Sequence, residues 1–465
     1  MEVVDAPDST KEVEVLTGNP RKAILALAIP SMVALAAQAV NNVINAAWVA
    51  GLGEDAMAAV GIVFPLFFII IGFSNGIGIG ASSAIARRIG RGNKAEADDA
   101  ATHAIMLAVV ISLILTPILL ILVNPLMHSM GGHSIIEDCV EYATPILLMM
   151  IVFMLVGVMS SVLRAEGAAK RAMYILVIAA VLNLVLDPFF IYDFGLGWGL
   201  AGAAWATVLA ESIALIVMMY WYFVKKNIYL SIKFKGFRFK KSTTFDIFRV
   251  GIPAASEMMI ISFVSVIMNL ILESASGTDA VAVYSTDWRL IQMLMIPLMG
   301  IAMAVVPVCA AAYGARKNDK IQEAYRYSLR ISIVAMIAIC IVTAITAPYI
   351  TMIFTYSADS LHDMMVEFLR ISCVFLPFLA FGFVSASLFQ ALGMGVRSLI
   401  STAFRNGLMI PAAFLAMTFG TLTTVWWAVC AAEIAGCLLV GIWCLATMRV
   451  LMRGYSPKTD CGNVS

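Results

Sequence analysis

The chain has 465 residues, of which 62% are hydrophobic and only 13% charged, and its mean hydropathy is +0.95. Soluble proteins carry roughly 25% charged residues, so this composition excludes a soluble globular protein and indicates a protein of the lipid bilayer. The formal net charge is +1, and we expect no nucleic-acid partner.

Residues 1–20 lack the basic region and short apolar segment that mark a secretory signal peptide. We therefore predict a short cytosolic tail without regular structure. In "TGNPRKA", Asn19 is suited to cap a helix and Pro20 to occupy its first position. The first membrane helix is expected to begin directly after the tail.

Long apolar runs, separated by charged and turn residues, predict twelve transmembrane helices. The first six lie near residues 24–50, 57–86, 101–123, 141–163, 172–192 and 201–224. The second six lie near residues 250–272, 280–311, 327–352, 366–390, 398–418 and 423–448. The predicted fold class is an all-α integral membrane protein with two six-helix bundles.

The two halves resemble each other in sequence. "GEDAMAAV" at 53–60 matches "GTDAVAVY" at 277–284, and "WATVLAE" ending at Glu211 matches "WAVCAAE" ending at Glu433. Because each half has an even number of spans, the copies keep one orientation and form a parallel pseudo-two-fold repeat. The expected segments are a tail (1–20), the first bundle (21–224), a basic cytosolic linker (225–249), the second bundle (250–450) and a tail (451–465).

The distribution of positive charge predicts the orientation. With both termini in the cytosol, nearly all of the 30 lysines and arginines fall in the cytosolic tails and loops, above all in the linker at 225–249. This asymmetry follows the positive-inside rule. We expect a multi-pass protein of the cell membrane with both termini in the cytosol.

Four side-chain amides lie in the first apolar run. Gln38, Asn41, Asn42 and Asn45 follow the i, i+3, i+4, i+7 spacing, which places them on one helix face. Hydrogen bonds between helices, worth about 0.6 kcal/mol each, would explain a single amide. Four on one face favour a water-filled cavity, since unpaired amides in hydrocarbon are costly.

The fifth predicted helix carries "LNLVLDPFF", in which Asn183 and Asp187 are four residues apart and share a face. An acid inside a membrane is by default a candidate functional residue. At a rise of about 1.5 Å per residue, the depths of five polar side chains agree. We expect these to meet in the outer half of the first bundle: Asn41, Asn45, Asn183, Asp187 and Thr207.

For the other charged residues within the predicted spans we expect different roles. Glu211 and Glu433 lie near mid-membrane, where each either lines a cavity or packs in its protonated form. Glu257 and Arg405 are both placed in the inner third, and we predict that they form a structural ion pair. Glycines at every fourth position in "GFSNGIGIG" predict close helix packing.

Two classes of function find no support in the sequence. No GxxxxGK[ST] motif is present, so this chain does not use ATP through such a site. An enzyme would need a clustered nucleophile, base or metal set, whereas the four histidines are scattered, and we expect neither an enzyme nor a bound metal cofactor. The histidines are His103, His128, His133 and His362.

Several segments together resemble the multidrug and toxic compound extrusion (MATE) transporters, most closely their DinF-type prokaryotic branch. These segments are "LTGNPRKAILALAIPSMV", "WVAGLGEDAMAAVG", "GASSAIARRIGRGNKAEAD", "LRAEGAAKRAM", "NLVLDPFFIYDFGLGWGLAGAAWAT" and "RVGIPAA". The resemblance implies two six-helix bundles and export of organic cations coupled to Na⁺ or H⁺ influx. It also implies an ion site made by an Asp on helix 1, an Asn and an Asp on helix 5, and a Thr on helix 6.

The last three of these residues correspond to Asn183, Asp187 and Thr207, but Asn45 stands where the helix 1 Asp is expected. Asn41 replaces a Tyr, and Gly157 and Ser160 replace two asparagines. The resemblance thus leaves the coupling ion open. The expected coupling set is Asp187, Asn183, Thr207 and Asn45, and Na⁺ would use the first three.

The predicted function is secondary active export of organic cations, amphiphilic drugs or metabolites by alternating access, with Na⁺ or H⁺ as the only accessory ion. We expect a monomer in the bilayer with a small-molecule substrate. The substrate cavity is expected to comprise Gln38, Asn41, Asn45, Ser160, Asp187 and Glu211. The alternative is a lipid-linked oligosaccharide flippase, for which Arg289 and Arg405 are the central candidates to bind a pyrophosphate.

Overall fold

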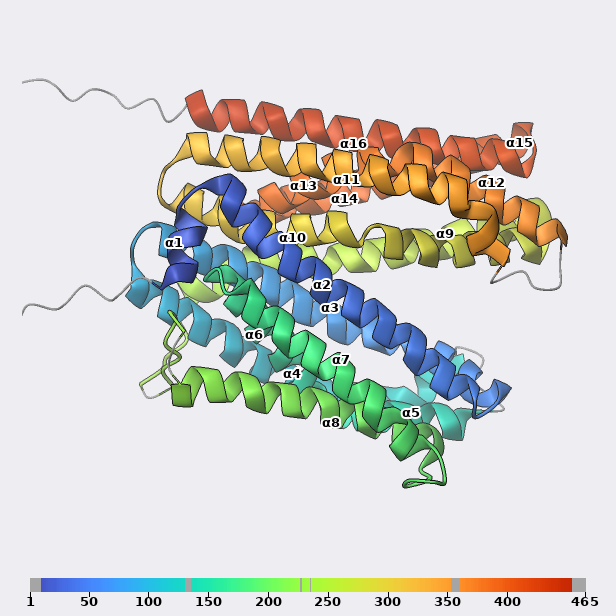
Figure 1. Ribbon diagram of the computed structural model, residues 1–465, viewed down its shortest axis with the longest axis horizontal. Coiled ribbons are helices and arrows are strands. Elements are labelled where there is room, and N and C mark those ends of the chain that lie inside the picture. Colours follow the sequence, from blue (N-terminus) through green and yellow to red (C-terminus); the bar gives the residue numbers. More distant parts are fainter. Residues whose placement is uncertain (1–9, 130–134, 226–227, 235, 353–358, 454–465) are drawn as a thin grey trace, which may run out of the picture.

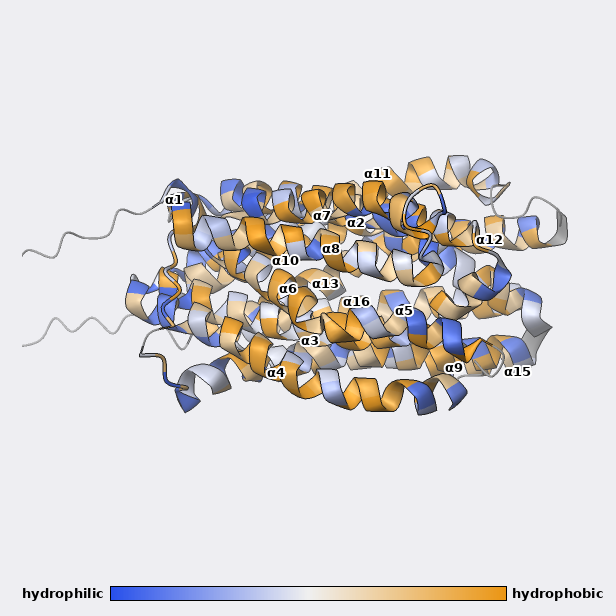
Figure 2. Cartoon of the chain, turned by 90° about the horizontal axis from the view of Figure 1, so that it is seen from below, coloured by the Kyte–Doolittle hydropathy of each residue, from blue (hydrophilic) through white to orange (hydrophobic). Residues whose placement is uncertain are grey.

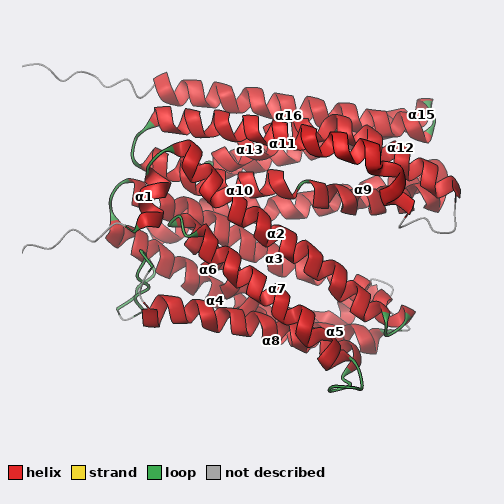
Figure 3. Cartoon of the chain, in the orientation of Figure 1, coloured by secondary structure: helices red, strands yellow, loops and turns green. Residues whose placement is uncertain are grey.

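The computed structural model of the chain describes residues 10–129, 135–225, 228–234, 236–352 and 359–453, and these residues are almost entirely helical (Figure 3). The helices of the first half are α1 (Lys11–Thr17), α2 (Pro20–Ala50), α3 (Glu54–Gly90), α4 (Lys94–Ser129), α5 (Ile136–Leu148), α6 (Met150–Ala165), α7 (Ala169–Ile191) and α8 (Gly199–Met219). The helices of the second half are α9 (Lys241–Leu294), α10 (Ile296–Gly314), α11 (Asn318–Met352), α12 (Asp359–Phe375), α13 (Leu379–Ala391), α14 (Gly395–Gly407), α15 (Met409–Phe419) and α16 (Leu422–Arg453).

The membrane spans agree with the hydropathy pattern. Within the described residues, eleven helices or helix pairs are long and apolar enough to cross a membrane, and the bent pair α5 and α6, at 52°, makes a twelfth span. Gly277, whose φ of 77° interrupts the helix, divides α9, and the candidate span of α9 lies before it at Lys241–Ser274. Hydrophilic residues gather at the two ends of the helices, with an apolar belt between them (Figure 2). The prediction of twelve transmembrane helices in two bundles is confirmed.

α2 begins as its sequence predicts. The side-chain oxygen of Asn19 accepts hydrogen bonds from the backbone N–H groups of Arg21 (3.0 Å) and Lys22 (3.4 Å), and Pro20 is the first helical residue. These contacts satisfy two donors that a helix start leaves free. The helix starts four residues before the apolar run because the cap, and not hydrophobicity, fixes its first turn.

Helices α2–α8 form one group and α9–α16 the other, and the two groups converge at the end of the molecule that carries α1 (Figure 1). We call this end, which also holds the 90–94 turn and residues 228–234 and 236–240, the linker end. Close packing there depends on glycine: a Cβ at Gly76 or Gly80 of α3 would collide with the α9 backbone at Gly251 or Ile247. The predicted close packing is confirmed at these two glycines, while Gly72 faces open space.

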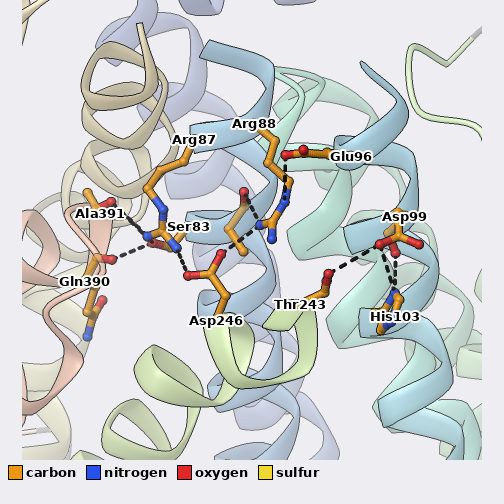
Figure 4. A network of polar contacts seen from close by, with 11 residues as sticks. Ser83, Arg87, Arg88, Glu96, Asp99, His103, Thr243, Asp246, Gln390 and Ala391 are labelled. Atoms are coloured by element: carbon orange, nitrogen blue, oxygen red, sulfur yellow. Dashed lines mark hydrogen bonds and ion pairs between the residues drawn. The ribbon is translucent and has the colours of Figure 1, made fainter. Parts of the chain in front are cut away.

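Charged side chains also join the two bundles at the linker end (Figure 4). Asp246 of α9 accepts hydrogen bonds from Arg87 (2.5 Å) and Arg88 (2.8 Å) of α3. Ser83 of α3 donates to the backbone carbonyl of Gln390 at 2.6 Å. These contacts tie α3 to α9 and α13, so the bundles are closed against each other at this end.

The first helix corrects the prediction of an unstructured tail over residues 10–20, while residues 1–9 of that prediction lie outside the described part of the chain. α1 is capped by Thr10, and its apolar residues Val13 and Leu16 are buried. Lys320 of α11 donates to the carbonyls of Thr17 (2.7 Å) and Gly18 (2.6 Å). The segment is helical because two apolar positions three apart find a surface of the bundles to cover, which a hydropathy scan for membrane spans does not detect.

Candidate functional site

Asn183 of α7 is the centre of a polar cluster in the first bundle. Its side-chain oxygen accepts hydrogen bonds from the amides of Asn41 (2.9 Å) and Asn45 (3.5 Å) on α2. Its own amide donates to Asp187 Oδ1 (2.7 Å) and Thr207 Oγ1 (3.1 Å). The structure thus brings together the five side chains whose depths agree in the sequence, and we call them the Asn183 cluster.

The bonding leaves specific oxygens free in the Asn183 cluster. Asn183 itself uses both of its N–H groups and its oxygen, so it organises the others. Within the described residues, Asp187 Oδ2 and Asn41 Oδ1 are buried and have no hydrogen-bond partner. Asp187 is 1% exposed and Asn183 2% exposed. A buried carboxylate oxygen without a donor is costly unless a proton or a cation compensates it.

One contact holds together the two helices that carry most of the cluster, and one proline leaves a backbone carbonyl free beside it. The Tyr192 hydroxyl at the end of α7 donates to the Trp48 carbonyl of α2 at 2.8 Å, and their rings meet edge to face. Trp48 lies three residues after Asn45, so this contact fixes the adjacent turn of α2. Pro188 has no N–H, and the Leu184 carbonyl therefore lacks its usual intrahelical donor beside Asp187.

The other residues predicted for the substrate cavity are placed differently. Gln38 is exposed on α2. Ser160 of α6 is buried, and among the described residues no group bonds its hydroxyl. Glu211 of α8 is partly buried, one helical turn from Thr207, and its Oε2 likewise has no partner within the described part of the chain. No described hydrogen bond joins these three side chains to the Asn183 cluster.

The predicted pair between Glu257 and Arg405 is wrong. Arg405 of α14 donates to Glu433 of α16 at 2.8 Å, whereas Glu257 of α9 accepts from Ser398 of α14 at 2.6 Å. Glu257 also accepts from the Gln390 amide of α13 at 3.4 Å. Arg405 is directed to Glu433, and no described ion pair joins it to Glu257.

The Arg87 and Asp246 contact was missed in the sequence. The positive-inside rule counts Arg87 and Arg88 only among the loop charges that predict the orientation, but Arg87 is 5% exposed. The available signal was an arginine three residues before the end of the long apolar helix α3, with Asp246 near the start of another helix. This signal is weak because the sequence does not show which helix ends meet in the folded protein.

Among the described residues, no group of three or more His, Cys, Asp or Glu side chains is placed to hold a metal. The Asn183 cluster has one carboxylate and several neutral oxygens. Oxygen ligands of these kinds are suited to coordinate a hard cation such as Na⁺.

Comparison with known proteins agrees with this architecture. The MatE family model matches residues 30–189 and 253–415, one segment in each bundle. This chain belongs to the MATE family of membrane transporters. The multidrug export protein MepA of Staphylococcus aureus strain MSSA476 is 25% identical over 415 residues, covering 89% of this chain and 90% of MepA. MepA of Staphylococcus haemolyticus is 24% identical over 431 residues, covering 92% and 94%.

Solved MATE structures are more similar still. An outward-facing conformation of a multidrug resistance MATE family transporter is 35% identical, with a TM-score of 0.93 over 96% of this chain and 99% of that one. A transporter of the MOP superfamily from Pyrococcus furiosus, described as having a binding pocket of reverse polarity that suggests a different function, is 34% identical, with a TM-score of 0.93 over 96% and 99%. A complex of a MATE protein with MaL6 is 34% identical, with a TM-score of 0.92 over 96% and 100%.

Proposed function

We propose that this MATE protein exports organic cations or amphiphilic compounds and couples their export to inward movement of Na⁺ or H⁺ at Asp187. One observation carries the proposal: Asp187 is the only acid of the Asn183 cluster, and its Oδ2 is buried without a partner within the described residues. Such an oxygen binds either a proton or a cation. The multidrug export activity of the MepA relatives supports the substrate class.

Alternating access fits the way in which the bundles meet. The contacts of Asp246 with Arg87 and Arg88 and the glycine packing of α3 on α9 all lie at the linker end. With this end in the cytosol, as the positive charges favour, the protein is closed toward the cytosol. The high similarity to an outward-facing MATE structure supports that state.

The binding surface for substrate is proposed to lie on α2 and α8 around the cluster. Asn41 and Asn45 offer neutral oxygens, and Asp187 and Glu211 attract a cation. Gln38 and Ser160 would extend this surface along α2 and α6. Occupation of Asp187 by the coupling ion and attraction of a cationic substrate use the same charge, which makes the two mutually exclusive.

The flippase alternative is weakened by the second bundle. Recognition of a pyrophosphate requires free positive charge, and Arg405, one of the two candidates, is neutralised by Glu433 at 2.8 Å, which leaves Arg289 alone. We therefore retain the exporter, acting as a monomer without covalent chemistry.

Transport assays in proteoliposomes test the proposal. Efflux of a fluorescent organic cation would be followed under a pH gradient and a Na⁺ gradient imposed separately. We expect one of the two gradients to drive it. If neither gradient accelerates efflux above that of protein-free vesicles, secondary active export is wrong.

The variant Asn45→Asp identifies the ion. It places a second carboxylate in the cluster, and two nearby carboxylates favour the state in which they share a proton. Proton-driven efflux of N45D should therefore persist to higher pH than that of the wild type. An unchanged pH profile, together with efflux driven only by Na⁺, would assign Na⁺ to the natural site.

A further inference from the structure

The first turns of α9 have two opposite faces. Thr243, Asp246, Ile247 and Val250 follow the i, i+3, i+4, i+7 spacing and turn toward the first bundle: Figure 4 shows Thr243 and Asp246 pointing to residues of α3 and α4. Lys241, Thr244, Phe245 and Phe248 follow the same spacing on the other side. They line a groove of about 450 Å³, which Phe239 completes.

The groove lies where the apolar part of α9 begins. The candidate membrane span of α9 runs from Lys241 to Ser274, so the groove is at the boundary between lipid and water. Its aromatic walls are open to the surroundings, with Phe239 50% and Phe245 67% exposed. Phe239 is held in place by an edge-to-face contact with the buried His103 ring. Aromatic rings at this depth are typical of contact with lipid.

Three polar features converge on this groove. Within the described residues, Thr244 Oγ1 is buried without a hydrogen-bond partner, although threonine in a helix usually bonds a carbonyl of the preceding turn. Lys241 is exposed and forms no ion pair in the described part of the chain. The N-cap residue Lys240 makes no side-chain capping bond. Its own N–H donates to His103 Nε2 at 2.9 Å, so the N–H groups of the following first turn and the positive dipole end remain available.

The surrounding charge is positive once the ion pairs are counted. Asp246 is neutralised by Arg87 and Arg88, and Asp99 pairs with Lys240 at 3.1 Å. Arg238, also exposed, adds to the field of Lys241. A hydroxyl, an ammonium group and free backbone donors above an aromatic slot suit a phosphate with an apolar chain below it.

We infer that this groove binds an anionic phospholipid, with the phosphate at Lys241 and Thr244 and an acyl chain along Phe245 and Phe248. The bound lipid contacts the face of α9 opposite Asp246. It therefore stabilises the first turn of the helix on which the contact between the bundles depends.

Thermal unfolding of the detergent-purified, delipidated full-length protein tests this inference without any transport assay. Unfolding would be followed with a thiol-reactive dye, because cysteines such as Cys139, Cys309 and Cys437 are buried in the folded protein. The protein is titrated with phosphatidylglycerol, phosphatidylcholine or inorganic phosphate. A ligand that binds only the folded state raises the unfolding temperature. We expect phosphatidylglycerol alone to raise it by a saturable amount.

Matched variants locate the site. Lys241→Gln should increase the half-saturating phosphatidylglycerol concentration about fivefold, as expected for one lysine near an anionic lipid. Lys233→Gln removes an equal charge from the same segment outside the groove and should leave this concentration nearly unchanged. Thr244→Val removes only the hydroxyl and should weaken binding about two- to tenfold, which keeps the test available if the lysine variant does not fold.

Three outcomes would overturn the inference. Equal stabilisation by phosphatidylcholine would show that the negative headgroup is not recognised. Equal stabilisation by inorganic phosphate would show a phosphate site without a lipid chain. Equal loss in the Lys241 and Lys233 variants would show diffuse attraction to the basic segment and no specific groove.

Discussion

Glu211 and Glu433 occupy matching positions in the two repeats, but the side chains around them differ. In the second bundle, Arg405 donates to Glu433 at 2.8 Å and neutralises it. The repeat places the uncharged Asn183 at the position that corresponds to Arg405, since both pairs are about 220 residues apart. The first bundle therefore contains Asp187 without an internal cation. The proposed coupling at Asp187 depends on this difference, because the charge of an acid paired with an arginine is already compensated.

The largest expected effect is that of Asp187→Asn on coupling. The amide is nearly isosteric and can keep the bond to Asn183, so the fold should survive, but it offers no negative charge for a proton or cation. We expect gradient-driven efflux from proteoliposomes to fall to that of protein-free vesicles.

Two variants sharpen this comparison. Asp279→Asn changes an exposed acid of α9 in the same way and should transport normally, whereas Glu433→Gln should affect stability more than coupling. If Asp187→Asn transports at the rate of the wild type under either gradient, the first bundle does not carry the coupling ion. Glu211, Glu257 or Asp287 would then be the next candidates.

The second prediction concerns the ion pair of the second bundle. Arg405→Gln leaves Glu433, which is 1% exposed, without its cation in a buried site. Breaking such a pair costs about 3–5 kcal/mol, so the unfolding temperature of the purified variant should fall by many degrees. The double variant Arg405→Gln with Glu433→Gln should recover most of this loss.

Arg397→Gln provides the control, since Arg397 lies on the same helix and is exposed. A single Arg405 variant as stable as this control would mean that Arg405 and Glu433 are not coupled. It would also remove the physical basis for the contrast between the bundles.

The membrane spans and the Asn183 cluster could be predicted from the sequence, and the reason is physical. A bilayer requires uninterrupted apolar runs of known length, and helical spacing fixes which amides share a face. With the direction of each helix known, rise per residue gave the depth of Asn183 and Asn41 closely enough to predict their meeting. No information on packing between helices was needed for this.

The predictions that failed depended on which side chains of different helices come into contact. The pair of Glu257 with Arg405 was wrong because Arg405 bonds Glu433 and Glu257 bonds Ser398, and similar depth does not decide which neighbour a side chain faces. α1 was missed since its stability comes from burying Val13 and Leu16 on other helices. The contact of Arg87 with Asp246 depends on which helix ends meet, and that is decided by the packing of Gly76 and Gly80.

The third prediction uses a second buried acid of the first bundle, outside the membrane spans. Glu166 follows α6 at the linker end, is 1% exposed and accepts a hydrogen bond from the Leu230 N–H at 3.0 Å. Burial raises the pKa of Glu166 to about 8, against about 4.3 in an unfolded chain. The folded protein then holds a proton that the unfolded chain releases between these values.

The free energy of unfolding should therefore be highest at low pH and fall as pH rises toward 8, by at most about 1.4 kcal/mol per pH unit. Unfolding temperatures measured from pH 5.5 to 8.5 should show a smaller decrease for Glu166→Gln, which is neutral throughout. Parallel curves for the wild type and this variant would contradict the assignment of a buried, protonated Glu166 to the first bundle.

The smallest expected effect is that of Tyr192→Phe, which tests how the first bundle holds its cluster without an ion pair. The variant keeps the ring that meets Trp48 edge to face but removes the hydroxyl that donates to the Trp48 carbonyl at 2.8 Å. Loss of one such hydrogen bond costs about 1 kcal/mol, so the unfolding temperature should fall slightly. Tyr349→Phe removes the hydroxyl of a residue that is 73% exposed and should have no effect.

Because Asn45 lies one turn before Trp48, the Tyr192 variant should also weaken binding of the coupling ion, which would appear as a higher half-saturating Na⁺ or H⁺ concentration in efflux assays. A stability loss without this change would show that the contact supports the fold of the first bundle but does not position the Asn183 cluster.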